Sequence, residues 1–327
     1  MRAAVLNENH DLEVAEVADP SPGPGELVLQ VIACGICGSD LKLQPSMPAG
    51  LVMGHEFCGE IVATGADTDA AWRVGRHVTA LPLIGCGHCL ACLGGEPAHC
   101  DTVDMVGVGG SPGGFAEYVR VDQRETVALP ESIEPALGAL VEPLAVGLHA
   151  VERAHIRSGD TVLVVGAGPV GLSVITWAAR SGASELVVSD PSAVRREAAE
   201  QFGATRVVDP GAEPLEARYD VVIECVGLPG MTDTCVRAAA LHGHVVIAGV
   251  CTKPDPYVPI MAVMKELTMD FIVYYTRREF FSVVDALALG AVDAAAFVTK
   301  RVGLDGANDA FTELTEAKDQ RKVLVVP

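Results

Sequence analysis

Lysine and arginine are scarce in this chain of 327 residues: 23 of them stand against 43 aspartates and glutamates, for a formal net charge of −20. Nucleic acids and anionic membranes attract faces rich in lysine and arginine, so this imbalance argues against both as partners. Half of the residues are apolar, which excludes a disordered chain. The length suggests two domains, each with its own core.

Residues 1–20 lack the apolar stretch of a secretory signal, and we expect a cytoplasmic protein. The segment from Thr161 to Ala179 contains no charged residue and approaches the ~20 residues needed to cross a bilayer. Its closely spaced glycines and its proline instead indicate a buried strand, a tight turn and a helix. In such a chain the ten cysteines are expected to be metal ligands or core thiols rather than disulfides.

The two parts of the chain differ in their hydrophobic pattern. Up to about residue 135, short β-branched runs are broken by glycine and proline, which predicts a β-rich domain. After Pro143, continuous apolar runs alternate with helical stretches at 161–168, 185–190, 205–209, 219–227 and 243–249. Continuous runs are typical of strands buried on both faces, so this part predicts a doubly wound parallel sheet and an α/β fold.

A glycine-rich turn follows the first of these runs. It comprises Gly166, Ala167, Gly168, Pro169, Val170 and Gly171. Such a turn allows backbone N–H groups at a helix N-terminus to approach a pyrophosphate. Asp190 ends the next strand, where a carboxylate binds ribose hydroxyls and repels a 2′-phosphate. The sequence therefore predicts a dinucleotide site that prefers NAD, although Arg195 and Arg196 nearby would suit the phosphate of NADP.

Four cysteines, Cys86, Cys89, Cys92 and Cys100, lie close together in a polar loop with small residues between them. Four thiolates can enclose one tetrahedral zinc ion without an open position, which predicts a structural site. The first three cysteines also have a spacing found in iron–sulfur proteins, so that alternative stays open here.

A second set of possible ligands is dispersed. Cys37, His55 and Glu142 each lie at the edge of an apolar run. A thiolate, an imidazole and a carboxylate would leave a fourth zinc position open for water or a substrate oxygen. The hydrophobic pattern alone does not show that these residues meet.

Several motifs in one order resemble the zinc-dependent medium-chain dehydrogenase/reductase family, which includes alcohol, polyol and threonine dehydrogenases. They cover nearly the whole chain: CGICGSD (34–40), MGHEFCGEIVATG (53–65), the four-cysteine loop, GGFAEYV (113–119), EPLAVGLHA (142–150), GAGPVG (166–171) and ECVG (224–227). The resemblance implies a GroES-like catalytic zinc domain over residues 1–140. It also implies a Rossmann NAD-binding domain over 141–271, and a C-terminal segment, 272–327, that completes the first domain.

The resemblance also implies roles for single residues. Cys37, His55 and Glu142 match ligands of a catalytic zinc, where Glu142 binds directly or through water. Glu56 matches a glutamate that can approach this zinc, Asp40 the carboxylate that orients the histidine, and Ser39 the hydroxyl that receives the substrate proton. Contacts to the cofactor are implied for Val170, Asp190, Arg195, Ala248, Gly249 and Val250, with Arg321 a weaker candidate.

One position departs from the family pattern. Lys42 stands where many members carry a histidine that passes the proton to solvent. An exposed lysine with its ordinary pKa of about 10.4 stays charged at neutral pH. The relay is therefore expected to run through the nicotinamide ribose and water. The short loop between Asp40 and His55 leaves the size of the substrate pocket open.

The implied activity is hydride transfer between NAD and a secondary alcohol, polyol, diol or amino alcohol, with two zinc ions per chain. One thiolate and one carboxylate make the zinc centre formally neutral and exchangeable, which favours substrates with a second oxygen or nitrogen over ethanol. Alternatives are an NADPH-dependent aldehyde or ketone reductase of the same family, or a catalytically silent nucleotide-binding protein. The family also implies a homodimer or homotetramer.

Overall fold

The computed structural model describes residues 1–316 and 320–327, and the chain forms two compact units. One unit comprises residues 1–143 and 275–327, and the other comprises residues 144–274. Within the described ranges, no helix combines the length and the apolar character needed to span a lipid bilayer.

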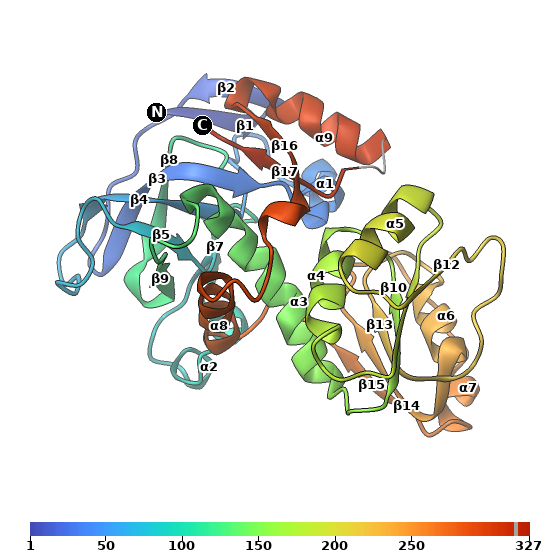
Figure 1. Ribbon diagram of the computed structural model, residues 1–327. Helices are drawn as coiled ribbons and strands as arrows, with labels where there is room; N and C mark the ends of the chain where they lie inside the picture. Colours follow the sequence, from blue (N-terminus) through green and yellow to red (C-terminus); the bar gives the residue numbers. More distant parts are fainter. Residues whose placement is uncertain (317–319) are drawn as a thin grey trace. The chain divides into compact units, whose positions relative to one another are not determined.

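The first unit is rich in antiparallel strands (Figure 1). Its main sheet has the order β16-β17-β3-β4-β5-β9, with β8 paired to β3, and two small sheets pair β1 with β2 and β6 with β7. The strands are β1 (Arg2–Leu6), β2 (Leu12–Glu16), β3 (Glu26–Gly35), β4 (Glu56–Thr64), β5 (His77–Ala80), β6 (Leu83–Ile84), β7 (Asp104–Met105), β8 (Tyr118–Asp122), β9 (Thr126–Ala128), β16 (Val298–Val302) and β17 (Lys322–Val325).

The C-terminal strand of the chain joins this sheet. Strand β17, the apolar run at the C-terminus, pairs antiparallel with β3 at Leu324↔Gly35. On the core side, the rings of Phe115 and Phe311 meet edge to face at 5.8 Å, in a cluster that also buries Phe57. The C-terminal segment therefore supplies both a strand and core side chains to the unit that contains the N-terminus.

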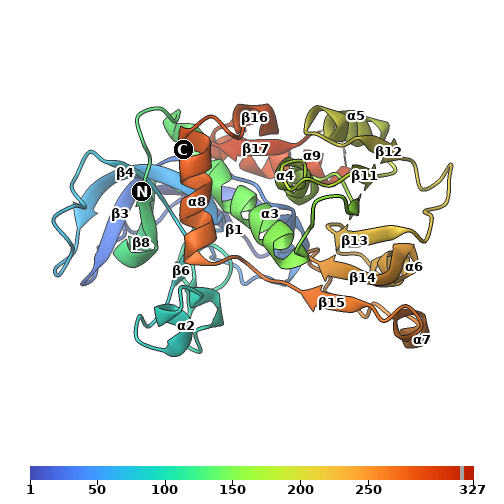
Figure 2. The same ribbon diagram turned by 60° about the horizontal axis from the view of Figure 1, so that its bottom comes forward.

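The helices of the first unit are short and lie outside the sheet. They are α1 (Gly38–Leu43), α2 (Leu90–Leu93), α8 (Arg277–Ala288) and α9 (Ala307–Glu316). The loop around α2 lies beside the start of α8 in both views, and the backbone N–H of Arg277 donates to the carbonyl of Gly95 at 2.8 Å (Figures 1 and 2). Helix α3 (Val141–Ala154) begins in this unit and continues into the second.

The second unit is a six-stranded parallel sheet of order β12-β11-β10-β13-β14-β15. Helices α4 and α5 lie on one face and α6 on the other (Figure 1). The elements are β10 (Thr161–Val165), α4 (Pro169–Ala178), β11 (Glu185–Ser189), α5 (Ala193–Gln201), β12 (Arg206–Val208), β13 (Tyr219–Glu224), α6 (Met231–Ala238), β14 (Ala239–Ile247), α7 (Pro259–Val263) and β15 (Thr268–Phe271).

This strand order is that of a doubly wound dinucleotide-binding fold, with the direction of winding reversing between β10 and β13. Central strands such as β10 and β13 are buried along almost their whole length because helices cover both faces. The predicted α/β class is confirmed, and the charge-free stretch from Thr161 is a strand, a turn and a helix.

Candidate functional site

Cys37, Ser39 and Asp40 lie at the start of helix α1. Cys37 is the N-cap residue, and Oδ2 of Asp40 accepts its backbone N–H at 2.9 Å in a capping box. Such reciprocal bonds satisfy N–H groups that have no partner within the helix. The Cys-Gly-Ser-Asp sequence thereby places the thiol and the carboxylate on the same turn, with Ser39 half-buried between them.

His55 is held beside Asp40. Its Nδ1 lies 3.1 Å from Oδ1 of Asp40, and both side chains are buried. A carboxylate at one ring nitrogen orients an imidazole and leaves the other nitrogen for a metal. Burial alone would lower the pKa of His55, but the charge and hydrogen bonding of Asp40, together with Cys37, raise the pKa well above its usual value.

The pairing of β3 with β4 brings the dispersed ligands together. Gly35 and Glu56 are partners in this antiparallel ladder, so the residues just beyond them, Cys37 and His55, also become neighbours. Ligand atoms of Cys37, His55 and Glu56 all lie within 4.8 Å of one another. Sulfur, imidazole nitrogen and carboxylate oxygen are the donors that zinc takes in proteins.

Glu142, on the first turn of α3, lies outside that group of three. Its side chain is buried, and Oε1 accepts a hydrogen bond from the hydroxyl of Tyr275 at 3.0 Å. Burial raises the pKa of Glu142 to about 7, and the nearby charge of Glu56 adds to this increase. The pKa is lowered in part by the charges of His55 and Lys322 and by the hydrogen bond from Tyr275. Glu142 is therefore within electrostatic reach of His55 and Glu56, and Tyr275 is a partner that the sequence pattern did not indicate.

Lys322 is a second partner absent from the sequence predictions. Its Nζ donates to both carboxylate oxygens of Glu56, at 2.7 and 2.6 Å, and to the carbonyl of Ile36 at 3.0 Å. Lys322 is 1 % exposed. Burial would lower its pKa, but Glu56 raises the pKa above its ordinary value. The only feature of the sequence that could have pointed to Lys322 is its position at the start of the C-terminal apolar run.

The buried charges at this place suit a divalent cation. Asp40, Glu56 and Glu142 are all less than 5 % exposed, beside the half-buried thiol of Cys37 and the one buried lysine of the described residues. Buried charges are normally paired or coordinate a metal. Because Lys322 already engages both oxygens of Glu56, the remaining negative charge fits zinc in both donor type and sign.

The four-cysteine lobe, residues 85–100, is a second potential metal centre. The ligand atoms of Cys86, Cys89, Cys92 and Cys100 lie within 4.8 Å of one another. Backbone N–H groups of the lobe point at its own sulfurs: Cys89 donates to Cys86 at 3.3 Å, and Cys86 to Cys100 at 3.4 Å. That bond and the hydroxyl of Thr102 lower the pKa of Cys100 to about 6. Such N–H···S bonds favour the thiolates that a tetrahedral metal needs.

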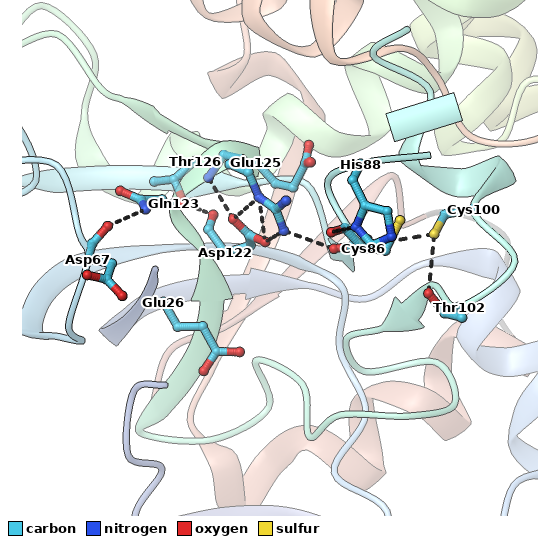
Figure 3. A network of polar contacts seen from close by, with 12 residues as sticks. Glu26, Asp67, Cys86, His88, Cys100, Thr102, Asp122, Gln123, Glu125 and Thr126 are labelled. Atoms are coloured by element: carbon cyan, nitrogen blue, oxygen red, sulfur yellow. Dashed lines mark hydrogen bonds and ion pairs between the residues drawn. The ribbon is translucent and has the colours of Figure 1, made fainter. Parts of the chain in front are cut away.

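A polar network ties the lobe to the sheet (Figure 3). The guanidinium of Arg124 contacts the carboxylate of Asp122 and donates to the carbonyl of Gly85 at 2.9 Å. In the next position along the chain, the buried carboxylate of Glu125 forms an ion pair with the partly exposed Arg277. The lobe is thus held by the charge-assisted bond from Arg124, just after β8, and by the backbone bond from Arg277 at the start of α8.

In the second unit, the glycine-rich turn joins β10 to α4. Gly166 has φ of +97°, a conformation that favours glycine, and a Cβ on Gly171 would lie 2.0 Å from the carbonyl oxygen of Gly166. Around Gly168, by contrast, a Cβ would meet nothing closer than Nη1 of Arg195 at 4.0 Å. The N-terminus of α4 is therefore open to an anion at Gly168, with Pro169 at the first helical position.

Asp190 lies at the end of β11, next to this turn. Its Oδ2 accepts the N–H of Ala167 at 2.9 Å, and its Oδ1 accepts the N–H of Ser192 at 2.9 Å. Arg195 approaches Oδ2 at 3.9 Å, while Arg196 donates to the Asp190 carbonyl at 2.7 Å and pairs with Asp209. The carboxylate holds the turn in place, and both arginines already face acidic or carbonyl groups.

Glu224, at the end of β13, organises two further loops. Its Oε1 accepts the N–H groups of Val226 and Gly227, both at 2.7 Å, and its Oε2 accepts that of Gly249 at 3.2 Å. Glu224 is 1 % exposed. It joins the ECVG motif to the Ala248–Val250 turn, a role that its place at the end of an apolar run could have suggested.

The remaining predicted residues occupy varied surroundings. Val170 is half-buried on the first turn of α4, and Val250 is exposed after β14. Lys42 is exposed on α1. The backbone N–H of Arg321 donates to Oγ1 of Thr299 at 3.2 Å in the first unit.

Comparison with known proteins places these features in context. Residues 23–131 match the alcohol dehydrogenase GroES-like domain, and residues 169–288 match the zinc-binding dehydrogenase domain. The chain is 32 % identical to (R,R)-butanediol dehydrogenase of Bacillus subtilis over 354 aligned residues, covering 100 % of both sequences.

Two further relatives are of similar closeness. L-threonine 3-dehydrogenase of Pyrococcus abyssi is 34 % identical over 331 residues, covering 95 % of this chain and 94 % of that protein. The crystal structure of a protein from Sinorhizobium meliloti 1021, described as a zinc-binding dehydrogenase and bound to NADP, is 33 % identical. It superimposes with a TM-score of 0.91 over 100 % of this chain and 99 % of the other.

Proposed function

This chain belongs to the zinc-dependent medium-chain dehydrogenase/reductase family and is an alcohol oxidoreductase; from that premise we propose that it oxidises a polyol, a diol or an amino alcohol at a secondary carbon to the ketone, with NAD as hydride acceptor. The observation that carries the proposal is the group of Cys37, His55 and Glu56 ligand atoms beside the buried Glu142. The relatives named for butanediol and threonine support a substrate with two neighbouring polar groups.

We assign the catalytic zinc to Cys37, His55 and Glu142, with Glu142 bound directly or through water. When bound, the ion supplies Lewis-acid polarisation of the substrate oxygen. Asp40 fixes the imidazole of His55, and Lys322 neutralises Glu56 and draws both of its oxygens toward the ammonium group. One thiolate and one carboxylate then balance the ion, which leaves the centre able to accept a second substrate oxygen or nitrogen.

Ser39 is proposed as the first proton acceptor. Its hydroxyl lies on the same turn as Cys37 and Asp40, so it can accept the alcohol proton and pass it on. Lys42 is exposed on the same helix, and we propose that ribose hydroxyls and water complete the relay. In the net reaction the alcohol loses one proton to solvent and one hydride to the nicotinamide, and becomes a ketone.

Nucleotide binding is assigned to the second unit. The turn formed by Gly166, Gly168, Pro169, Val170 and Gly171 is proposed to bind the pyrophosphate, with N–H donors from its residues other than Pro169 and Gly166, whose N–H already donates to the carbonyl of Ser189. Arg195, Ala248, Gly249 and Val250 are proposed as further contacts. Asp190 is proposed to bind the adenosine ribose, which favours NAD. The domain roles follow: 1–140 with 272–327 for catalysis, and 141–271 for NAD.

The NADPH-dependent reductase remains a second candidate because a specific observation favours it. Arg195 approaches Oδ2 of Asp190 at 3.9 Å, and the S. meliloti relative binds NADP. We favour NAD because a 2′-phosphate would have to approach the Asp190 carboxylate, and both arginines already have acidic or carbonyl partners. An Asp190→Ser variant should then gain relative activity with NADP.

We propose that the four-cysteine lobe holds a second, structural zinc, and that the chain forms a homodimer or homotetramer. For the oligomer, support comes from the edge strand β15 of the second unit and the apolar side chains near it. Ile260, Val263, Met264, Phe271 and Val273 are each more than half exposed. Unpaired thiols at all ten cysteines suit a reducing, cytoplasmic location. Analytical ultracentrifugation would measure the subunit number.

A substrate panel tests the proposed function directly. Vicinal diols, polyols, amino alcohols and primary alcohols are each supplied with NAD or NADP, and the absorbance of the reduced cofactor is followed. We expect the highest kcat/KM for a substrate with neighbouring polar groups and NAD. Turnover confined to aldehyde or ketone reduction with NADPH would support the second candidate, and no turnover in either direction would refute the assignment.

A further inference from the structure

Tyr275 is a buried residue whose hydroxyl contacts Glu142. It lies between β15 and α8, is 3 % exposed, and donates a hydrogen bond to Oε1 of Glu142 at 3.0 Å. The two residues are 133 positions apart in the chain. The ring stacks on Phe280, with centroids 5.5 Å apart and planes inclined by 20°. Stacking on Phe280 holds the ring of Tyr275 in place and so determines where its hydroxyl contacts the Glu142 carboxylate.

The residues that follow Tyr275 are anchored on two sides. Thr276 caps α8 in a capping box with Glu279. Arg277 donates its backbone N–H to the carbonyl of Gly95, inside the four-cysteine lobe, and its guanidinium binds the buried carboxylate of Glu125, with Nε 3.0 Å from Oε2. The four-cysteine lobe therefore contacts Arg277, which the backbone of Thr276 joins to Tyr275, and Tyr275 contacts Glu142.

We propose that Tyr275 is a positioning residue for the Glu142 carboxylate, and that the four-cysteine lobe sets the position of Tyr275 through Arg277. The inference rests on the proposed function, in which Glu142 serves the catalytic zinc. A carboxylate free to rotate would hold a metal, or its water, less firmly, since partners that orient metal ligands contribute about 10–100-fold to affinity. The lobe thus supports the reactive centre in addition to stabilising its own loop.

The test measures the release of zinc to a chromophoric chelator, which does not depend on turnover. The zinc-loaded wild type is expected to release zinc in two phases, one from each centre. Tyr275→Phe keeps the stacked ring and removes only the hydroxyl, so it should speed the phase of the catalytic centre by about tenfold or more and leave the lobe phase unchanged. Tyr257→Phe, at an exposed tyrosine, should match the wild type.

The link to the lobe is tested at the side chain of Arg277, which binds Glu125; the adjacent Arg124 contacts the carbonyl of Gly85 in the lobe. Arg277→Met should speed the release of zinc from the catalytic centre, and Arg277→Lys should release zinc at a rate between those of Arg277→Met and the wild type. Arg278→Gln, at the exposed neighbouring position, should release zinc at the wild-type rate. Cobalt substitution gives a second readout: the visible absorption of the catalytic cobalt should shift in Tyr275→Phe. If Arg277→Met does not fold, Arg277→Lys alone decides the point, because it weakens the ion pair without leaving Glu125 buried and unpaired.

Each outcome distinguishes the two claims. Wild-type release kinetics and cobalt spectra in Tyr275→Phe would overturn the positioning role while leaving the proposed function intact. Wild-type kinetics in both Arg277 variants, with an effect in Tyr275→Phe, would overturn the link to the lobe alone. If Cys37→Ser retained as much zinc as the wild type, the proposed function and this inference would both be overturned.

Discussion

The two candidate metal centres of the first unit are built in opposite ways. The ligands of the four-cysteine lobe lie within residues 86–100, and their sulfurs accept N–H groups from the same loop. The centre at Cys37, His55 and Glu142 draws its side chains from three separate elements and its supports from Tyr275 and Lys322, far away in the sequence. A local centre can stabilise a loop by itself, whereas a dispersed one depends on the whole unit.

The two centres also differ in how their surroundings shift the pKa values of their side chains. In the lobe, a backbone N–H and a hydroxyl lower the pKa of Cys100 to about 6, whereas burial raises the pKa of Cys92 to about 12. At the dispersed centre, burial raises the pKa of Glu142 to about 7, and Lys322 is buried against Glu56. Perturbed buried charges are typical of sites that perform chemistry, which supports the proposal that the dispersed centre is the reactive one.

The largest effect that separates the two centres is expected from Cys37→Ser. Loss of the thiolate should remove the catalytic metal and lower kcat by about 10³-fold or more, since Lewis-acid catalysis contributes several kcal/mol. Zinc content should fall by one ion per chain, and affinity for NAD should stay the same. Cys251→Ser, at a half-buried thiol of the second unit, is the control. Turnover that survives Cys37→Ser would remove the metal from the mechanism.

Loss of a ligand in the four-cysteine lobe should lower the thermal stability of the protein. Cys89→Ser is expected to release the lobe metal and lower the thermal midpoint by ~10 °C or more, because several kcal/mol of metal binding correspond to shifts of this size. Differential scanning calorimetry with metal analysis measures both. Leu90→Ser, at the 89 % exposed neighbour, should leave zinc and midpoint unchanged. An unchanged midpoint in Cys89→Ser would mean that the lobe holds no structural metal.

Lys322→Met tests the balance of buried charge. It leaves Glu56 buried without its partner, which should cost about 3–5 kcal/mol of unfolding free energy. Adding Glu56→Gln should recover most of that loss. Lys300→Met breaks an exposed pair with Glu313 and should cost less than about 1 kcal/mol. Urea unfolding measures all four proteins, and equal costs at Lys322 and Lys300 would contradict the account.

A smaller effect is expected from Asp40→Asn, which keeps the shape of the side chain and removes its charge. The affinity of the Cys37–His55 centre for zinc should fall about 10–100-fold, because Asp40 orients His55. The lobe should keep its affinity. Competition titrations with a chelator separate the two, with Asp305→Asn at an exposed carboxylate as the control. Equal losses at both centres would indicate general destabilisation.

The amino-acid pattern was sufficient for the fold class because its signals are local. Continuous apolar runs such as those of β10 and β13 predict strands covered on both faces, and the glycine-rich turn follows β10 as expected. The cysteine spacing likewise indicated one centre, because its ligands are close in sequence. These features need no knowledge of distant contacts.

The supports of the dispersed centre could not be read in this way. Lys322 and Glu56 are 266 positions apart, and they meet because β17 joins β3 in the sheet. Tyr275 belongs to none of the motifs in the sequence, and only the fold shows its hydroxyl on Glu142. Glu224 is intermediate: its place at the end of an apolar run could have suggested a role, but the sheet determines which two loops its carboxylate joins.

The most direct test of the central claim is an anomalous difference map recorded at the zinc absorption edge on crystals of the zinc-loaded protein. We predict two peaks per chain, one within the four-cysteine lobe and one bounded by Cys37 and His55 with Glu142 alongside. A single peak in the lobe, with Cys37 and His55 empty, would contradict the account.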